Sequence, residues 1–387
     1  MSWVEDYRAL FDAPQRCVYF DTSYDCGGSS VGRAAVQRYF DDWADAAVEN
    51  ERGGPGRARF FRVADETRSF LATLLGGVDP AQICFTRNTN EGINIILQGF
   101  RFRPGENVVF HSFDHDSVVL PCLSARDCRG VPLKIVPAKG HCVTAEELIA
   151  ACDEHTRMIV TSHVQPATGY CIDLKLLGDF CRSRGIFLVV DAIQSLGMMP
   201  FEAEKWGVDA VAAAGYKWLG AINSIGFLYL TGRLAREVAP CYAAAGPYVD
   251  FDPETFELIC TDPAKARKFE NSSLDNPGIY ALHDGVRKLL DIGVERIAEH
   301  AGRLTARLIE GLKALGYTVV TPADPKYRAT IVSLLPGDKQ AMFDFFRSKN
   351  IALSISHGRF LRFGVAPYNT DADVNAVLHA AGVCPLR

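Results

Sequence analysis

Two ionisable residues each follow an apolar run and could take part in chemistry. Asp191 ends the run "IFLVVD", and Lys217 follows the run "DAVAAAGY" 26 positions later (217 − 191). Lysine and aspartate are seldom buried unless another group uses or pairs with their charge. A lysine and an acid at the ends of neighbouring strands therefore indicate a functional site.

This pair suits pyridoxal phosphate (PLP) chemistry. A lysine forms a Schiff base with this cofactor, and an acid pairs with its pyridinium nitrogen so that the ring accepts electrons. We therefore hypothesise that Lys217 and Asp191 hold PLP. Taken alone, Lys217 is more simply a surface lysine and Asp191 a helix N-cap.

Apolar runs alternate with amphipathic segments through the first two thirds of the chain. Short β-branched runs without period-2 alternation are typical of strands buried on both faces of a mostly parallel sheet. Strands are predicted at 82–86, 107–111, 132–137, 156–163, 186–192, 209–215 and 224–230. We therefore predict an α/β fold with a mostly parallel sheet covered by helices.

The last third has a different order of elements. A helical pattern starts at "NPGIYAL" and continues through "ERIAEHAGRLTARLIEGLKALG", and short apolar runs and a closing helix follow. This order predicts a smaller α+β domain that is joined to the larger α/β domain through one long helix. We place a PLP-binding large domain at 18–284 and the small domain at 285–387, with the N-terminal segment 1–17 packed near the small domain.

Sites in open α/β sheets lie at the carboxyl ends of the strands. The polar residues there are Thr89, Asn90, Glu91, Asp114, His115, His163, Gln165, Asp191, Gln194, Tyr216 and Lys217. GxGxxG and GxxxxGK[ST] motifs are absent, and no GxSxG string follows a predicted strand, so a dinucleotide fold, a P-loop and a nucleophile elbow are unsupported. His111 and His115 lack the HExxH pattern, so we predict no metal site.

Composition narrows the class of protein. The 387 residues are enough for two domains, and a net charge of −5 gives no bulk attraction for nucleic acid or acidic membranes. Neither a signal-peptide pattern nor a long uninterrupted apolar run is present. The 12 cysteines form no CxxC pair, as is typical of reduced thiols. We expect a cytoplasmic protein without nucleic-acid or membrane partners.

The sequence resembles fold-type I PLP enzymes of the class V aminotransferase superfamily, which includes cysteine desulfurases, kynureninases and isopenicillin N epimerase-like proteins. The likeness covers almost the whole chain. It rests on eight segments in family order, namely "VYFDTSYDCGG", "TRNTNEGIN", "FDHDSVVLP", "TSHVQPATG", "VVDAIQSLG", "GYKWLG", "FENSSLDNPGIYAL" and "RFGVAPYNTDADV".

The resemblance implies roles around the cofactor ring. Lys217 is implied to form the Schiff base, Asp191 to pair with the pyridine nitrogen, and His115 to stack on the ring. Gln194 is implied to reach the ring hydroxyl. Lys217, Asp191 and His115 form the catalytic set that the resemblance implies.

The resemblance also implies the phosphate and substrate ligands. Thr89 and Asn90, at a helix N-terminus, and Tyr216 are implied to hold the phosphate. Ser273 matches a residue that relatives donate to the phosphate from a second subunit, which implies a homodimer with shared active sites. Arg362 matches the arginine that binds the α-carboxylate of the substrate, so the substrate is expected to be an α-amino acid.

Three features depart from the family pattern. Pro166 stands where relatives carry an asparagine near the ring hydroxyl, and Ala214 stands where they carry a serine. Desulfurases carry a nucleophilic cysteine on a loop shortly before the equivalent of Arg362, but the stretch "NIALSISHGRFLRFG" contains none. Cys26 is expected to be an inert buried thiol, because no neighbour in the sequence would lower its pKa.

These features predict a PLP-dependent change at Cα or Cβ of an α-amino acid. We favour β-elimination that breaks the C–S bond of an S-substituted cysteine, in an enzyme of specialised metabolism. Epimerisation as in isopenicillin N epimerase-like proteins, transamination and decarboxylation are alternatives. A pseudo-enzyme that serves in protein assembly is the non-enzymatic alternative.

Overall fold

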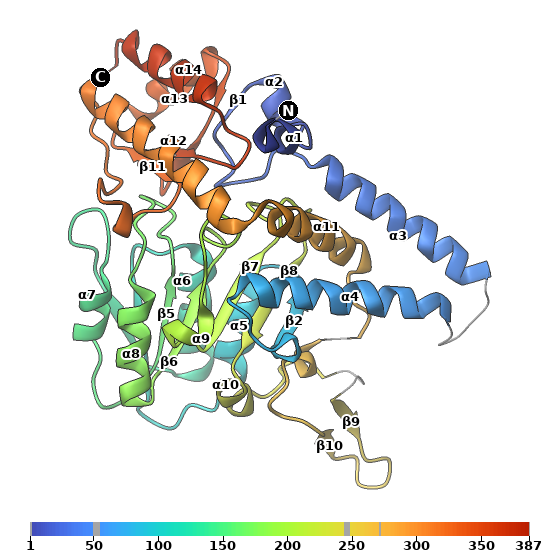
Figure 1. Ribbon diagram of the computed structural model, residues 1–387. Helices are drawn as coiled ribbons and strands as arrows, with labels where there is room; N and C mark the ends of the chain where they lie inside the picture. The colour runs from blue at the N-terminus through green and yellow to red at the C-terminus, as the bar shows by residue number, and fades with distance from the viewer. Residues whose placement is uncertain (1, 49–54, 244–247, 271, 387) are drawn as a thin grey trace.

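The computed structural model describes residues 2–48, 55–243, 248–270 and 272–386. A seven-stranded sheet in the order β2–β8–β7–β6–β5–β3–β4 forms its centre (Figure 1). The strands are β2 (Ile83–Thr86), β3 (Asn107–His111), β4 (Leu133–Val136), β5 (Thr156–Ser162), β6 (Phe187–Asp191), β7 (Ala210–Ala214) and β8 (Gly226–Leu230).

This sheet is mostly parallel. Strands β4, β3, β5, β6 and β7 run parallel to one another, while β8 is antiparallel to both of its neighbours, β7 and β2. Every residue of β3, β6 and β7 is buried. Strands buried on both faces explain the unbroken apolar runs of the sequence, and the predicted α/β fold is confirmed.

Helices cover both faces of the sheet and extend beyond one edge of it (Figure 1). α11 packs against α3 and α4, and the outer ends of α3 and α4 project away from the sheet. The helices are α3 (Ser30–Val48), α4 (Pro55–Leu74), α5 (Thr89–Gly99), α6 (Asp116–Arg129), α7 (Ala145–Ala150), α8 (Leu174–Arg184), α9 (Ala203–Trp206), α10 (Gly232–Glu237) and α11 (Asn276–Ile292). The hairpin of β9 (Val249–Phe251) and β10 (Leu258–Cys260) lies apart from the sheet.

The C-terminal residues build a second, smaller sheet in the antiparallel order β11–β14–β13. β12 pairs in parallel with β1, so the start of the chain joins its end. The elements are α1 (Trp3–Arg8), α2 (Ala13–Arg16), β1 (Val18–Tyr19), α12 (Val294–Ala314), β11 (Ile331–Leu334), α13 (Lys339–Ser348), β12 (Ile351–Ala352), β13 (Ser354–Ser356), β14 (Phe360–Gly364) and α14 (Asp371–Gly382).

The expectation of one long connecting helix is wrong. The structure has two helices, α11 and α12, which are separated at Gly293 with a φ of 91°. A positive φ leaves the right-handed helical region, and glycine adopts it readily because it has no Cβ. The expected domain boundary at 284/285 falls within α11 and stays a prediction.

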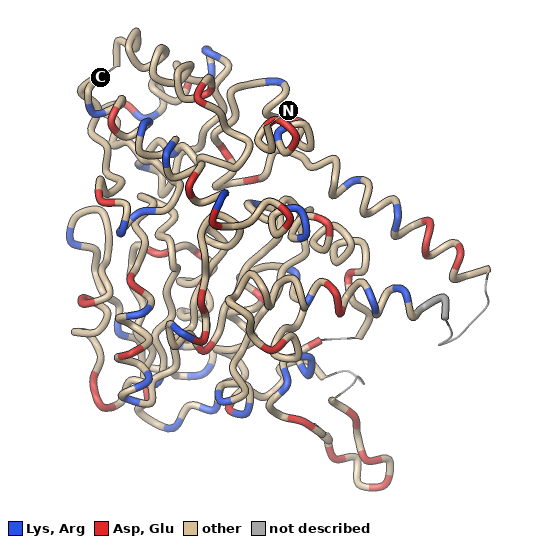
Figure 2. Tube along the Cα trace, viewed as in Figure 1, with Lys and Arg blue, Asp and Glu red and all other residues tan. Residues whose placement is uncertain are grey.

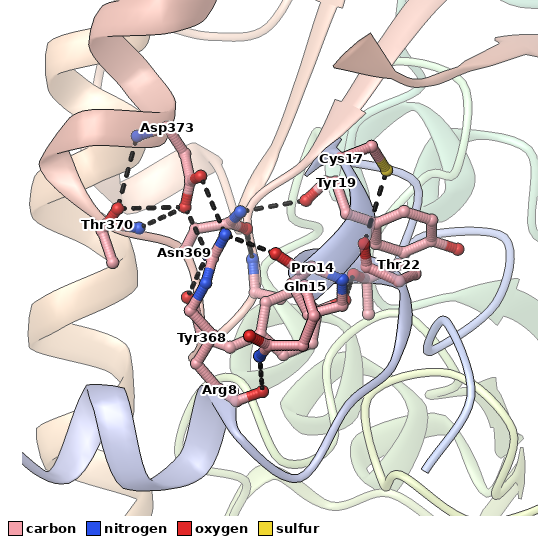
Figure 3. Close-up of polar contacts among 12 residues, drawn as sticks. Arg8, Pro14, Gln15, Cys17, Tyr19, Thr22, Tyr368, Asn369, Thr370 and Asp373 are labelled. Carbon is pink, nitrogen blue, oxygen red and sulfur yellow. Dashed lines mark hydrogen bonds and ion pairs between the residues drawn. The ribbon is translucent and has the colours of Figure 1, made fainter. Parts of the chain in front are cut away.

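Polar contacts join the N-terminal segment to the C-terminal residues (Figure 3). The Arg8 guanidinium donates to both carboxylate oxygens of Asp373, at 2.7 and 3.3 Å, and to the backbone carbonyl of Tyr368. Asn369 Nδ2 donates to the backbone carbonyl of Tyr19, and the Thr22 hydroxyl hydrogen-bonds the Tyr368 hydroxyl. These contacts hold the N-terminal segment against the C-terminal part of the chain.

The surface carries both signs of charge. Lysine and arginine are interspersed with aspartate and glutamate along the trace (Figure 2). Among the described residues, no helix has both the length and the apolar character that a membrane crossing requires. All 12 cysteines are free thiols.

Candidate active site

A cavity of about 510 Å³ opens beyond the carboxyl ends of β6 and β7. Six of the predicted site residues line it, namely Thr89, Asn90, His115, Tyr216, Lys217 and Arg362. They come from four separate stretches of the chain. The cavity is therefore a product of the fold rather than of any single motif.

Lys217 is buried in this cavity, with only 5% of its surface exposed. Burial, together with the positive charge of Arg362, lowers the pKa of its amine to about 7, while Asp191 and Asp21 oppose the shift. Because the neutral amine is the nucleophilic form, this environment prepares Lys217 to react with a carbonyl group.

A second buried lysine, Lys268, differs from Lys217 in its hydrogen bonds. Lys268 Nζ donates to the backbone carbonyls of Ala235, Val238 and Pro263 at 2.6, 2.7 and 2.9 Å. Three hydrogen bonds use all three protons of its ammonium group. Among the described residues, none forms a hydrogen bond with the Lys217 amine. Of these two lysines, Lys217 is therefore the one that is available for chemistry, and it lines the cavity.

Ser117 links Asp191 to His115. The Ser117 hydroxyl donates to Asp191 Oδ2 at 2.7 Å, and the backbone N–H of Ile193 donates to Asp191 Oδ1 at 2.9 Å. Burial raises the pKa of the Asp191 carboxyl, and these two hydrogen bonds oppose that shift. Asp191 lies behind the cavity wall, and Ser117 lines the cavity.

His115 is the N-cap of α6. Its Nδ1 accepts from the backbone N–H of Ser117 at 3.1 Å, so the neutral imidazole carries its proton on Nε2. Burial lowers the pKa of this ring and favours the neutral form. A neutral, apolar-faced imidazole is suited to stacking on an aromatic ligand.

The N-terminus of α5 forms another wall of the cavity. Asn88 caps this helix by accepting from the backbone N–H of Glu91, and Thr89 and Asn90 begin the helix. Thr89 Oγ1 is buried and has no hydrogen-bond partner. An unpaired buried hydroxyl costs free energy unless a ligand uses it, and free N–H groups at a helix N-terminus favour an anion.

Arg362 enters from β14 of the smaller sheet. Its Nε donates to Ser354 Oγ at 3.2 Å and its Nη1 to the backbone carbonyl of Pro166 at 3.1 Å. Burial lowers the pKa of the guanidinium to about 10, so Arg362 stays charged near neutral pH. Pro166 thus contributes its backbone carbonyl at the position where the expected asparagine is missing.

Besides Asp191, two predicted ligands do not line this cavity. Gln194 donates to the backbone carbonyl of Ser23 and accepts from Trp218 Nε1, both at 3.0 Å, which fixes both ends of its amide. Ser273 lines a neighbouring cavity of about 540 Å³ that shares Arg87 and Ser224 with the first. Their roles as cofactor ligands stay predictions, and within one chain the geometry does not bring Ser273 to the site.

Other polar residues at the strand ends are held by their own partners. Glu91 forms an ion pair with Arg87, and Asp114 contacts His111 and Ser162. His163 contacts the Cys171 thiol, and the Gln165 amide hydrogen-bonds the backbone of Val143. Within the described ranges, no group of three or more His, Cys, Asp and Glu residues could hold a metal ion. Burial raises the pKa of the Cys26 thiol to about 12, in agreement with an inert cysteine.

Several cavity residues were not predicted from the sequence. Ser23, Ser117, Asn223 and Ser224 all line the cavity. Ser117 had a weak signal, because it lies two residues after a histidine at a strand-to-helix turn. Serine and asparagine are common at turns, and nothing in the local sequence separates the other three from ordinary turn residues.

The family model for aminotransferase class V matches residues 33–377. The chain belongs to the class V aminotransferase family. A relative of this chain, a probable cysteine desulfurase from Methanothermobacter thermautotrophicus, is 34% identical over 324 residues, 81% of this chain and 78% of the relative. A probable cysteine desulfurase from Pyrococcus abyssi is 25% identical over 353 residues, 88% of this chain and 85% of the relative.

Solved structures share the fold of this class V family member. A cysteine desulfurase from Thermococcus onnurineus matches with a TM-score of 0.86 at 23% identity, covering 99% of this chain and 98% of the other. A cystine C–S lyase, solved in complex with its reaction product cysteine persulfide, matches with a TM-score of 0.83 at 19% identity, covering 96% and 99%. The whole chain therefore has the PLP fold-type I architecture.

As a class V aminotransferase family member, the protein is a PLP-dependent enzyme. The cavity fits this cofactor. The unpaired Thr89 hydroxyl at the N-terminus of α5 suits a phosphate, and the free Lys217 amine suits an aldehyde. The buried Asp191 carboxyl suits a pyridinium nitrogen. The individual roles of these residues are predictions, and two of them lead to direct tests.

Ser117→Ala should weaken PLP binding about tenfold, or ~1.4 kcal/mol. The substitution removes a hydrogen bond that favours the ionised form of Asp191, so the carboxylate becomes a poorer partner for a pyridinium. The affinity is measured by titrating PLP into apoenzyme and following visible absorbance. Ser124→Ala on the same helix is the control, because Ser124 does not line the cavity. Equal affinities for the Ser117 variant and the parent would contradict the role of Ser117.

Lys217 should react with PLP at a rate that rises between about pH 6 and about pH 8 and then levels off. The amine reacts only when neutral, and its pKa is lowered to about 7. Borohydride trapping at each pH, followed by peptide mapping, measures the rate and the site. Burial lowers the pKa of Lys268 as well, to about 8, but Lys268 should remain unlabelled because three backbone carbonyls hold its buried amine and it does not line the cavity. A rate that still climbs above about pH 9 would show an ordinary lysine pKa.

Proposed function

We propose that this enzyme breaks the C–S bond of an S-substituted cysteine by β-elimination. One observation carries the proposal: Lys217, with a pKa lowered to about 7, shares its cavity with Arg362, while residues 350–361 offer no cysteine thiol. An amine and an arginine suit an α-amino acid. The missing thiol removes the usual acceptor for persulfide transfer.

Comparisons with known proteins support this class of reaction. Relatives that cover most of the chain are named probable cysteine desulfurases, and one structure with the same fold is a cystine C–S lyase. Both names describe cleavage of a C–S bond. A lyase differs from a desulfurase in needing no protein thiol, which agrees with the stretch before Arg362.

Arg362 would orient the substrate. Its guanidinium is planar, buried and fixed by Ser354 and Pro166, and a planar donor matches the two oxygens of a carboxylate. With the carboxylate fixed on the side of Arg362, the Cα–H bond can be directed toward Lys217. PLP, when bound, accepts the electron pair that deprotonation leaves at Cα.

Lys217 would move the proton. Its neutral amine takes the proton from Cα, the C–S bond then breaks, and the sulfur leaves with the bonding electrons. His115 Nε2–H, or water, supplies the proton that makes the departing sulfur a thiol. Overall, an S-substituted cysteine and one water give a thiol, pyruvate and ammonium, so atoms and electrons balance without an oxidant.

The reaction is tested by supplying the PLP-loaded enzyme with cystine, S-substituted cysteines and alanine in D₂O. Pyruvate is expected together with an equal amount of thiol from the S-substituted cysteines, or of cysteine persulfide from cystine. Lys217→Arg should reduce their release at least a thousandfold because it removes the reactive amine. Cys26→Ala is the matched control and should keep the activity, because that thiol is buried and outside the cavity.

Other products would assign another reaction. Inversion or deuterium at Cα without pyruvate would indicate epimerisation, a keto acid other than pyruvate would indicate transamination, and carbon dioxide with an amine or an aldehyde would indicate decarboxylation. Any of these outcomes would overturn β-elimination. Absence of turnover with all of these substrates would overturn the proposal of a C–S lyase.

We also infer a homodimer in which the two active sites share residues. The cavity lined by Ser273 adjoins the site and shares Arg87 with it, so a partner chain could complete the phosphate end. Phe40, Trp43 and Phe61 on α3 and α4 are 46%, 56% and 59% exposed. Exposed aromatic side chains on two adjacent helices are typical of a protein interface.

Light scattering should give a mass near 85 kDa, twice the 42.4 kDa of one chain. In such a dimer, Ser273→Asp should weaken PLP binding about tenfold because its carboxylate would repel the phosphate. Ser183→Asp, on the exposed face of α8, should leave PLP binding unchanged. A monomeric mass, or unaltered PLP affinity in the Ser273 variant, would contradict the shared site.

A further inference from the structure

The backbone places two further polar residues, Ser354 and Asp21, around Arg362. Ser354 on β13 lies directly opposite Arg362 on β14, and Asp21 forms a bridge to Gly364, two residues further along β14. Residues two apart on a strand share one face. Asp21, Ser354 and Arg362 therefore come together from three parts of the chain.

Gly364 allows the N-terminal segment to approach this closely. A Cβ at this position would lie 2.7 Å from the backbone nitrogen of Ser23, closer than two such atoms can be. The Gly364 N–H also donates to the carbonyl of Phe20 at 2.6 Å. The segment that carries Asp21 is thus held directly on the strand that carries Arg362.

One hydrogen bond and one close approach connect the three side chains. Arg362 Nε donates to the Ser354 hydroxyl at 3.2 Å. The Asp21 carboxyl lies near that hydroxyl, which opposes the rise in its pKa that burial causes, and Asp21 Oδ1 has no hydrogen-bond partner among the described residues. The second anchor is the bond from Arg362 Nη1 to the backbone carbonyl of Pro166. Two anchors on different nitrogens fix the plane of the guanidinium, and Nη2 has no partner among the described residues.

The charge of Asp21 acts on Arg362 without a direct ion pair. Asp21 raises the pKa of the buried guanidinium, which burial lowers, yet the described contacts contain no direct bond between the two groups. A direct pair would occupy the donors that a substrate carboxylate needs. A serine placed between them keeps the compensating charge nearby and leaves the donors open.

We propose that Asp21 and Ser354 are positioning residues that hold Arg362 ready for the α-carboxylate of the substrate. The inference rests on the proposed role of Arg362 as the carboxylate ligand. It adds that selectivity for amino acids over amines depends on a network that begins in the N-terminal segment. Neither residue needs to touch the substrate.

The test compares an amino acid with the amine that lacks its carboxylate. Each is titrated into PLP-loaded enzyme, and binding is followed by visible absorbance. Ser354→Ala and Asp21→Asn should each weaken amino-acid binding about tenfold and leave amine binding unchanged, because only the carboxylate uses Arg362. Ser354→Thr keeps the hydroxyl and should retain most of the selectivity.

Ser333→Ala is a matched control. Ser333 on β11 lies opposite Arg362 from the other side of the strand, and its buried hydroxyl has no hydrogen-bond partner. Its removal should leave selectivity unchanged. A merely structural effect of the Ser354 or Asp21 substitution would weaken both ligands equally, and that outcome, or no change with either ligand, would overturn the inference.

Arg362→Gln separates this inference from the proposed function. If selectivity disappears in the Arg362 variant but persists in both Ser354→Ala and Asp21→Asn, the positioning network is wrong and the role of Arg362 stands. If the Arg362 variant retains full selectivity, then Arg362 is not the carboxylate ligand and both proposals are wrong.

Discussion

The active site depends on the cost of burying an amine that no acceptor holds. Water stabilises a charged ammonium strongly, so removing water from Lys217 favours its neutral form. Burial and the nearby positive charge of Arg362 together lower the pKa of Lys217 to about 7. Burial also lowers the pKa of Lys268, to about 8, but three backbone carbonyls hold its amine. The two lysines therefore differ in their hydrogen bonds and in their access to the cavity, which Lys217 lines and Lys268 does not.

The central sheet brings Lys217 together with the other residues of the site. Asp191 and Ala212 are register partners on the parallel strands β6 and β7, so the residues that follow both strands emerge at one edge. Small side chains on β7 let α5 approach closely, since a Cβ on Gly92 would lie 3.0 Å from that of Ala212. The N-terminus of α5, with its unpaired Thr89 hydroxyl, therefore opens into the cavity that holds Lys217.

The smaller sheet and the start of the chain complete the site from the other side. β14 supplies Arg362, and the N-terminal segment lies on the same strand because Gly364 has no side chain there. The backbone N–H of Cys26 then donates to the carbonyl of Tyr216, beside Lys217. One short segment thus touches both the strand that carries Arg362 and the turn that carries Lys217, so the spacing of these two side chains depends on it.

The sequence by itself determined the fold class and the residues at the strand ends. Apolar strands and amphipathic helices have periods that are visible in any chain, and parallel strands necessarily present their carboxyl ends on one edge. Lys217, His115 and Thr89 could therefore be predicted together. Only the tertiary structure decided which partners these groups have: Ser117 between Asp191 and His115, the two contacts that occupy Gln194, and the Asp21–Ser354 network. Hydrogen bonds act over about 3 Å between residues far apart in the chain, and such distances exist only after folding. The break at Gly293 had a different cause, because a glycine within a helical pattern is compatible with either a continuous or an interrupted helix, and packing decides between them.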